Sequence, residues 1–140
     1  MSGLYRQFKT NKDKDLGGVP VTFSANEDGT IPTFFLRRMG SGNSLYDAEL
    51  ARITKPFATE IQKGTLSNEQ SKNLTDTLFV RAIIAGWEHV QDEEGKEIKY
   101  NEANALNLIT QLPLLYDELK AAATNVSKFQ DEAKEAILKN

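Results

Sequence analysis

Three consecutive carboxylates, Asp92, Glu93 and Glu94, are the densest group of residues in this sequence that could transfer protons. General acid and base catalysis by a pair of carboxylates needs two environments that move the two pKa values apart, and partial burial is the usual cause. These three carboxylates stand in a turn sequence that ends at Gly95 and continues into Lys96. We therefore expect them to be solvated charges and not catalytic groups.

The segment from Ser24 to Gly29 has some of the residues of a calcium-binding loop. Asn26, Asp28 and Gly29 fall at the third, fifth and sixth positions of an EF-hand loop. That loop needs a bidentate glutamate at its twelfth position, where this sequence has Phe35. We expect a turn here, and we predict no metal ligands anywhere in the chain.

Other sources of catalytic chemistry are few. Gly40 and Gly42 could open a phosphate-binding loop, but the third glycine and the Gly-Lys-Ser/Thr ending of such loops are absent. His89 is the single histidine, and it follows a helix beside an expected exposed hairpin. The chain has no cysteine, which excludes disulfides, thiolate metal sites and cysteine nucleophiles. The sequence predicts a protein that is not an enzyme and has no catalytic residues and no cofactor.

The composition is that of one ordinary domain of 140 residues, with 39% hydrophobic and 26% charged residues. The net charge of −3 divides into six basic against four acidic residues over 1–40, and eleven against sixteen over 41–140. The sequence has no dense stripe of basic residues, which a nucleic-acid partner would usually require. No apolar run approaches the roughly 20 residues of a membrane span, and the start lacks the hydrophobic region of a signal peptide. We therefore expect a cytoplasmic location.

The first forty residues are predicted to form a β-rich segment that packs on a helical body of residues 41–140, the two counted as one domain. Residues 9–18 are polar and end in two glycines, so we expect a flexible lead-in or a turn there. Residues 19–23 and 31–36 alternate in strand fashion around the turn-forming residues 26–29. This pattern predicts an N-terminal β-hairpin.

The body is predicted to begin with a helix that Asn43 or Ser44 can cap. Pro56 should kink this helix or restart it, and Gly64 should end it. A capping box at residues 67–70 opens what we expect to be the central core helix, with an apolar stripe that extends as far as Trp87. A small exposed hairpin should follow, with strands at 87–90 and 96–100 around a turn at 92–95.

The last part of the chain contains the most regular periodicity. Asn101 should cap a short helix that ends before Pro113, and Pro113 suits the first turn of the final helix. That helix carries apolar residues at heptad spacing, namely Leu115, Leu119, Ala122, Val126, Phe129, Ala133 and Ala136. The stripe favours a terminal helix packed on its own domain over an intermolecular coiled coil. Together, the elements predict a mostly α (α+β) fold, a bundle of about four to five helices with an N-terminal β-hairpin and a small hairpin between helices.

Four segments between residues 85 and 129 carry a resemblance to a known family. They read Ala85-Gly-Trp-Glu-His-Val, Asp92-Glu-Glu-Gly-Lys-Glu-Ile, Tyr100-Asn-Glu-Ala-Asn-Ala-Leu and Leu112-Pro-Leu-Leu-Tyr-Asp-Glu-Leu, with Phe129 after them. In this order they resemble the phage tail assembly chaperones. In that family a helix ends in Gly-Trp, an acidic turn leads to a short capped helix, and a Leu-Pro step opens a last helix with a late phenylalanine. Upstream, Phe8-Lys-Thr-Asn-Lys12 matches the family's lead-in.

The resemblance implies a non-enzymatic role in building the tail of a siphophage. Proteins of this family bind and solubilise the tape measure protein, a long helical ruler, until the tail tube assembles around it. The implied location is the host cell cytoplasm, and the protein would be absent from the mature virion. The resemblance also implies self-association along the ruler, and a longer form, made by programmed frameshifting, that recruits the tail tube protein. This chain would be the short form.

Helix-in-groove recognition reads apolar side chains at heptad-like spacing. The candidate partner-binding residues are therefore Trp87, Leu115, Leu119, Val126 and Phe129, which are expected to share core packing with part of the binding of the ruler. A different class of function stays open, that of a structural head–tail connector or tail-completion protein. Such a protein is retained in the virion, whereas an assembly chaperone is not.

Overall fold

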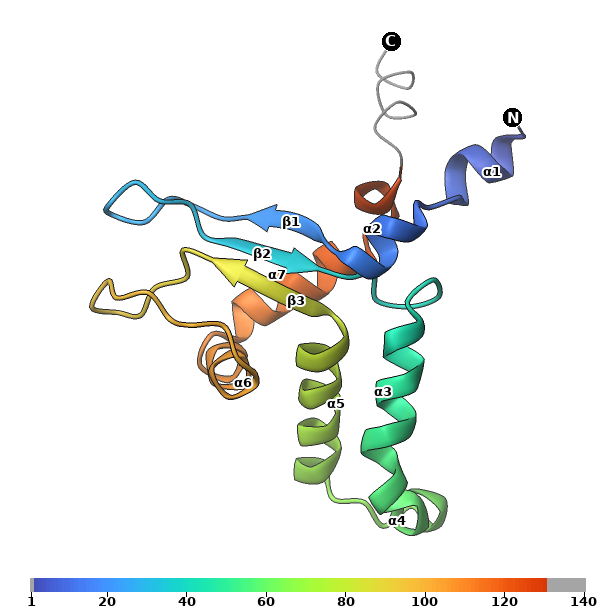
Figure 1. Ribbon diagram of the computed structural model, residues 1–140. Helices are drawn as coiled ribbons and strands as arrows, with labels where there is room; N and C mark the ends of the chain where they lie inside the picture. The colour runs from blue at the N-terminus through green and yellow to red at the C-terminus, as the bar shows by residue number, and fades with distance from the viewer. Residues whose placement is uncertain (1, 131–140) are drawn as a thin grey trace.

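The computed structural model describes residues 2–130, which form an α+β fold as the sequence predicts (Figure 1). The strands are β1 (Val19–Thr22), β2 (Thr33–Leu36) and β3 (Ile84–Glu88). The α-helices are α1 (Gly3–Phe8), α2 (Lys12–Gly17), α3 (Ser44–Thr54), α4 (Ala58–Lys63), α5 (Asn68–Ala82), α6 (Glu102–Gln111) and α7 (Pro113–Thr124). Two 3-10 helices complete the described part of the chain, η1 (Lys55–Phe57) and η2 (Val126–Phe129).

The sheet is antiparallel, with the strand order β1-β2-β3. The predicted N-terminal hairpin is confirmed, since β1 pairs with β2 from Val19 opposite Leu36 to Thr22 opposite Thr33. Strand β3 comes from the body and lies on the other side of β2, with Trp87 opposite Phe34. The first forty residues and the body therefore build one sheet together.

The prediction that the central helix reaches Trp87 is wrong, because α5 ends at Ala82 and the chain continues as β3. The open edge of β2 supplies partners for the backbone of residues 84–88, and Arg37 N donates to the carbonyl of Ile83. Backbone groups on a buried sheet edge must be paired, so tertiary pairing overrides the local helical spacing. Gly86, which weakens a helix, fits this outcome.

The small hairpin between helices is present in a short form. Its turn is held by Asp92 Oδ1, which accepts from the backbone N–H groups of Glu94 and Lys96. Beyond the turn, the pairing consists of a bridge between Gln91 and Glu97 and a hydrogen bond from Ile98 N to the carbonyl of Val90. Residues 87 and 88, which we assigned to this hairpin, belong to β3 instead.

The helical signals of residues 43–70 are confirmed. Pro56 interrupts the helix as η1 between α3 and α4, and Gly64 follows α4 with a left-handed φ of 69°. The capping box is complete, because Ser67 Oγ accepts from Gln70 N while Gln70 Oε1 accepts from Ser67 N. Helices α3 and α5 pack side by side, and α4 lies at the end of the pair that is distant from the sheet (Figure 1).

The predicted single last helix is wrong, because α7 ends at Thr124 and η2 follows. Asn125 leaves the helical region with a ψ of 103°, and its side chain accepts from Ser127 N to cap η2. An asparagine side chain can compete in this way with the backbone hydrogen bonds of a helix. Because the helix ends there, Phe129 no longer lies on the same helical face as Leu115 and Leu119. The stripe positions 133 and 136 lie outside the described residues.

The expected flexible lead-in at residues 9–18 is also wrong, since α2 occupies residues 12–17 and packs against η2. Asn11 caps α2 by accepting from Asp13 N and Lys14 N, and its own N–H donates to the carbonyl of Phe129. Lys14 Nζ donates to the carbonyl of Gln130. The polar residues that suggested a loop therefore serve as a helix cap and as tethers.

The core lies between the sheet, α5, α6 and α7, and its fully buried members come from all of these elements. They include Leu36, Phe79, Ile83, Ile84, Ile109, Leu119 and Phe129. Asn43, only 1% exposed, joins the parts around this core. Its Nδ2 donates to the carbonyls of Arg38 and Ala82, and its Oδ1 accepts from Tyr46 N to cap α3. One side chain thus connects the exit of β2, the start of α3 and the end of α5.

We predict that Asn43→Ala lowers the free energy of unfolding by about 2–4 kcal/mol, since it removes a helix cap and leaves two carbonyls without their donor. Urea denaturation measures the loss. Asn101→Ala is the matched control, because the Asn101 side chain caps α6 through Asn104 N at an exposed site, and it should cost only about 1 kcal/mol. Equal losses in the two variants would contradict the role assigned to Asn43.

Candidate functional site

The five candidate residues from the sequence separate into buried and half-buried side chains. Leu119 and Phe129 are each 0% exposed, so both lie in the core and present no surface. Trp87, Leu115 and Val126 are half-buried. Leu115 and Leu119 share one face of α7, whereas Trp87 lies on β3. Their proposed contact with a partner stays a prediction, and the accessible surface has to be sought around them.

Trp87 stands in a cluster of aromatic rings on the sheet. Its ring centroid lies 5.6 Å from that of Phe34 and 5.1 Å from that of Tyr100, with both pairs edge to face. Trp87 Nε1 donates to the carbonyl of Ile98 at 2.8 Å, and Tyr100 Oη donates to the carbonyl of Ile84. The polar atoms of both rings are thereby satisfied inside the protein, so only their apolar faces are available to a partner.

An open groove of about 620 Å³ lies at this cluster, and we call it the Trp87 groove. It is lined by Trp87, Glu88, His89, Glu97, Ile98, Lys99 and Tyr100. His89 has a left-handed φ of 58°, which turns the chain out of β3 at the groove wall, and its Nδ1 lies 3.0 Å from Glu97 Oε1. The groove therefore combines aromatic walls with two carboxylates, Glu88 and Glu97, and with the ammonium group of Lys99.

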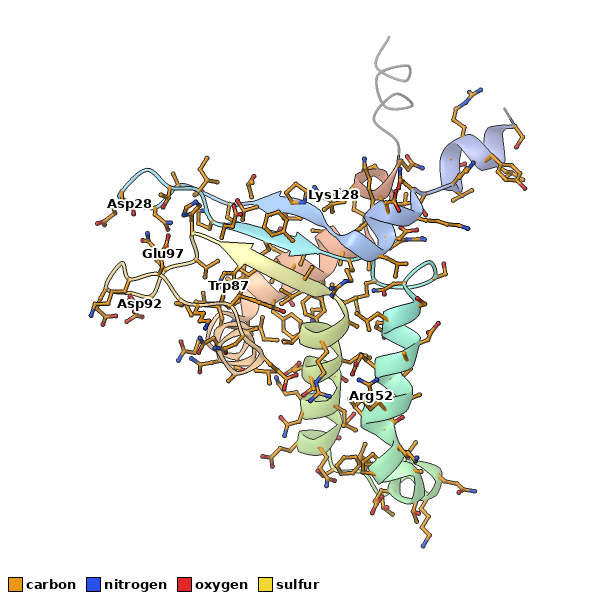
Figure 2. The ribbon with its side chains drawn as sticks, in the orientation of Figure 1. Asp28, Arg52, Trp87, Asp92, Glu97 and Lys128 are labelled. Atoms are coloured by element: carbon orange, nitrogen blue, oxygen red, sulfur yellow. The ribbon has the colours of Figure 1, made fainter. Side chains whose placement is uncertain are left out.

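The loops next to the Trp87 groove are tied together and carry further carboxylates. Gln91 Nε2 donates to Asp28 Oδ2, and Asn26 Nδ2 donates to the carbonyl of His89. Figure 2 shows Asp28, Asp92 and Glu97 at this same end of the molecule, on two different loops. Hydrogen bonds from Thr30, and then from Gln91, hold the pKa of Asp28 below its ordinary value, so this carboxylate stays charged.

A second groove, of about 560 Å³, runs between α5 and α7, and we call it the α5–α7 groove. Its lining comes from α5, α6 and the start of α7, and consists of Asn68, Ser71, Lys72, Thr75, Asp76, Ile109, Thr110, Pro113, Tyr116, Asp117 and Lys120. Lys72 Nζ lies 2.6 Å from Asp76 Oδ2, and Lys120 Nζ lies 4.1 Å from the centre of the Tyr116 ring. Its four charged side chains are two of each sign, so they cancel in formal charge.

Two leucines beside the α5–α7 groove are among the exposed apolar side chains that the sequence periodicity did not select. Leu112 is 49% exposed and Leu114 is 80% exposed, and they flank Pro113, which lines the groove. Leu114 falls between the heptad positions of α7 and was therefore not selected as a candidate. The Leu-Pro-Leu sequence was the available signal, because the proline marks the first turn of a helix and so places both leucines at the junction of two helices.

Within residues 2–130, no group of three or more His, Asp or Glu side chains is placed to hold a metal ion. In the same part of the chain, no helix is long and apolar enough to cross a membrane. The described structure defines a small α+β protein whose accessible features include two open grooves and a pair of exposed leucines beside one of them.

Comparison with known proteins adds the family. A family model described as YdaY prophage protein matches residues 41–140, and the chain therefore belongs to this family and is of phage origin. The match covers α3 to η2 and leaves out the N-terminal hairpin. No curated protein and no solved structure matches the chain.

Tyr116 in the α5–α7 groove predicts a pH dependence of stability. Burial raises the pKa of its hydroxyl, and the negative charge of Asp76 raises it further. The folded protein thus keeps a proton that the unfolded chain releases, so the stability from this group is complete below the ordinary tyrosine pKa of about 10 and declines above it.

We therefore expect the free energy of unfolding to fall more steeply above about pH 10 in the wild-type protein than in Tyr116→Phe. Urea denaturation of both proteins between neutral and alkaline pH measures the difference. Parallel curves for the two proteins would show that the Tyr116 hydroxyl does not contribute.

Proposed function

We propose that this phage protein is a tail assembly chaperone that binds and solubilises the tape measure protein while the tail tube is built. In this proposal the protein is not an enzyme, acts in the host cell cytoplasm and is absent from the mature virion. Its membership of a prophage family supports a phage role. The ordered motifs of residues 85–129 support the narrower assignment, through their resemblance to the tail assembly chaperones.

The observation that carries the proposal is the exposed apolar surface at the junction of α6 and α7. Leu114 is 80% exposed and Leu112 is 49% exposed, directly beside a groove between helices. Exposed apolar side chains grouped beside a groove mark interaction sites in soluble proteins. A groove between helices that is flanked by leucines suits an amphipathic helix, which inserts apolar side chains at spacings of three and four residues. The tape measure protein is a client of this kind.

The size of this surface fits a reversible coat. Full burial of one leucine contributes about 1.5–3 kcal/mol, so Leu112 and Leu114 together provide weak affinity for one site. Many chaperones bound along one long tape measure protein would still coat it, because the effective concentration of linked sites raises the overall avidity above the affinity of each single contact. Each single contact is weak enough for an arriving tail tube subunit to displace it.

The buried candidates have a supporting role in this proposal. Leu119 on α7 belongs to the core cluster, and Phe129 on η2 is fully buried. Helix α7 in turn positions Leu114. Substitution of either buried residue by a charge should unfold the protein and remove binding only as a consequence. Substitution of an exposed leucine should remove binding without unfolding.

We predict that Leu114→Asp, alone or combined with Leu112→Asp, reduces the recovery of soluble tape measure protein on co-expression by at least about tenfold. A tenfold reduction corresponds to the loss of about 1.4 kcal/mol of binding free energy. Circular dichroism should show the variant folded. The matched control is Ile61→Asp, which puts the same charge on a 44% exposed side chain of α4 and should leave recovery unchanged. Rescue of the ruler by Leu114→Asp at the wild-type level would contradict the assigned surface.

Mass spectrometry of purified virions separates the proposal from a structural connector or tail-completion protein. The chaperone should be absent from the particle while the tape measure and tube proteins are present. A fixed number of copies per virion would contradict the proposal and favour the connector.

A further inference from the structure

The sheet has two outer edges, β1 and β3, and they differ in their capacity to pair with a further strand (Figure 1). Along an antiparallel strand, every second residue directs its N–H and C=O groups away from the neighbouring strand. Phe23 N donates to the carbonyl of Pro32, which fixes this alternation and places Pro20 and Thr22 at the outward positions of β1. Because Pro20 has no N–H to donate, the edge of β1 is a poor template for another strand.

The outer edge of β3 has no such protection. The same alternation directs Thr33 and Phe35 of β2 toward β3, where they lie opposite Glu88 and Gly86. Trp87 stands between Gly86 and Glu88 and therefore directs its N–H and C=O groups away from the sheet. Within residues 2–130, these two backbone groups have no hydrogen-bond partner. The edge of β3 is thus open at Trp87.

The hairpin that follows β3 does not cover this edge. His89 interrupts the extended backbone at the end of the strand with its left-handed φ of 58°. The hairpin beyond it still closes, since Ile98 N donates to the carbonyl of Val90, but no strand pairing among the described residues continues from there along β3. The Trp87 groove lies in the resulting gap, with residues 87–89 on one wall and residues 97–100 on the other.

The charge around the gap indicates which kind of segment fits there. The loops at residues 25–29 and 88–99 contain seven carboxylates against two lysines, namely Glu27, Asp28, Glu88, Asp92, Glu93, Glu94 and Glu97. Two of these carboxylates line the groove itself, and Lys99 offsets one of them. Complementary charge selects the partner of a surface, so this end of the molecule favours a basic segment over an acidic one.

We propose that the outer edge of β3 binds an extended, basic segment of a partner protein by β-strand addition. The main chain of the segment pairs with the N–H and C=O groups of Trp87, and its cationic side chains lie beside Glu88 and Glu97. In this mode of recognition, main-chain hydrogen bonds give affinity and alternate side chains give specificity. The edge of β3 contains none of the exposed leucines of the proposed client surface, so the inference goes beyond the proposed function and stands independently of it.

Hydrogen exchange of single backbone amides, followed by NMR, tests the open edge in the full-length protein. In the free protein the Trp87 amide should exchange faster than the amides of Gly86 and Glu88, which pair with β2. The probe for binding is a capped peptide of alternating lysine and valine residues. At about ten times its Kd, this peptide should slow exchange of the Trp87 amide roughly tenfold. Equal protection of the three amides in the free protein would overturn the proposal.

Two comparisons identify the groups that make the contact. The same peptide with every backbone nitrogen methylated keeps its side chains and charge but has no main-chain donor, so it should bind at least about tenfold more weakly. The variant Glu88→Lys/Glu97→Lys should weaken binding of the unmodified peptide by about the same factor. The matched control, Glu69→Lys/Glu118→Lys on exposed residues of α5 and α7, should bind the peptide like the wild type.

The remaining outcomes each decide the proposal. Failure of the unmodified peptide to bind at low salt, or equal binding of the methylated peptide, overturns it. Protection of the Trp87 amide that rises with protein concentration alone also overturns it, because a second copy would then occupy the edge. Should Glu88→Lys/Glu97→Lys fail to fold, a peptide with glutamate in place of lysine must bind the wild type more weakly for the proposal to stand. Leu114→Asp should bind the peptide like the wild type, which separates this contact from the client surface.

Discussion

The fold depends on the buried amide of Asn43. It caps α3, and it donates to the carbonyl of Arg38 just after β2 and to that of Ala82 at the end of α5. A buried polar group without partners is costly, so these three segments are held in one arrangement. The same arrangement places residue 84 next to Leu36 and lets β3 complete the sheet. The walls of the Trp87 groove begin at the other end of β3, the strand whose start lies in this arrangement.

Local signals predicted the elements whose ends are determined by nearby residues. Ser67 and Gln70 form reciprocal hydrogen bonds within one helical turn. Pro56 and Gly64 restrict or permit backbone conformations at their own positions, so these helix boundaries could be predicted from the sequence. The change from helix to strand after Ala82 could not be predicted from the local sequence. Its cause is pairing with the edge of β2, which lies about fifty residues earlier in the chain. The heptad stripe of α7 failed for a similar reason, since it recorded which residues are buried and not the turn at Asn125 by which Phe129 reaches the core.

The candidate site was predictable only in its location. Trp87 and the start of α7 were identified from motif order and from periodicity, and both border a groove. Helical periodicity selects residues that lie on one face of a helix. The apolar face of a helix usually packs into the core, as Leu119 and Phe129 show. An exposed leucine at a helix start, such as Leu114, does not belong to such a face. It is exposed because no other part of the fold packs over it, and the sequence pattern does not contain this information. Only the packed structure distinguishes a binding side chain from a core side chain of the same type.

The exposed leucines and the Trp87 groove are built from different elements. Leu112, Leu114 and the α5–α7 groove belong to the helices α5, α6 and α7, whereas the Trp87 groove is lined by β3 and by residues 97–100. A partner on the proposed client surface would therefore leave the Trp87 groove open. The two surfaces still share one core, because α5 leads directly into β3 and both elements pack there.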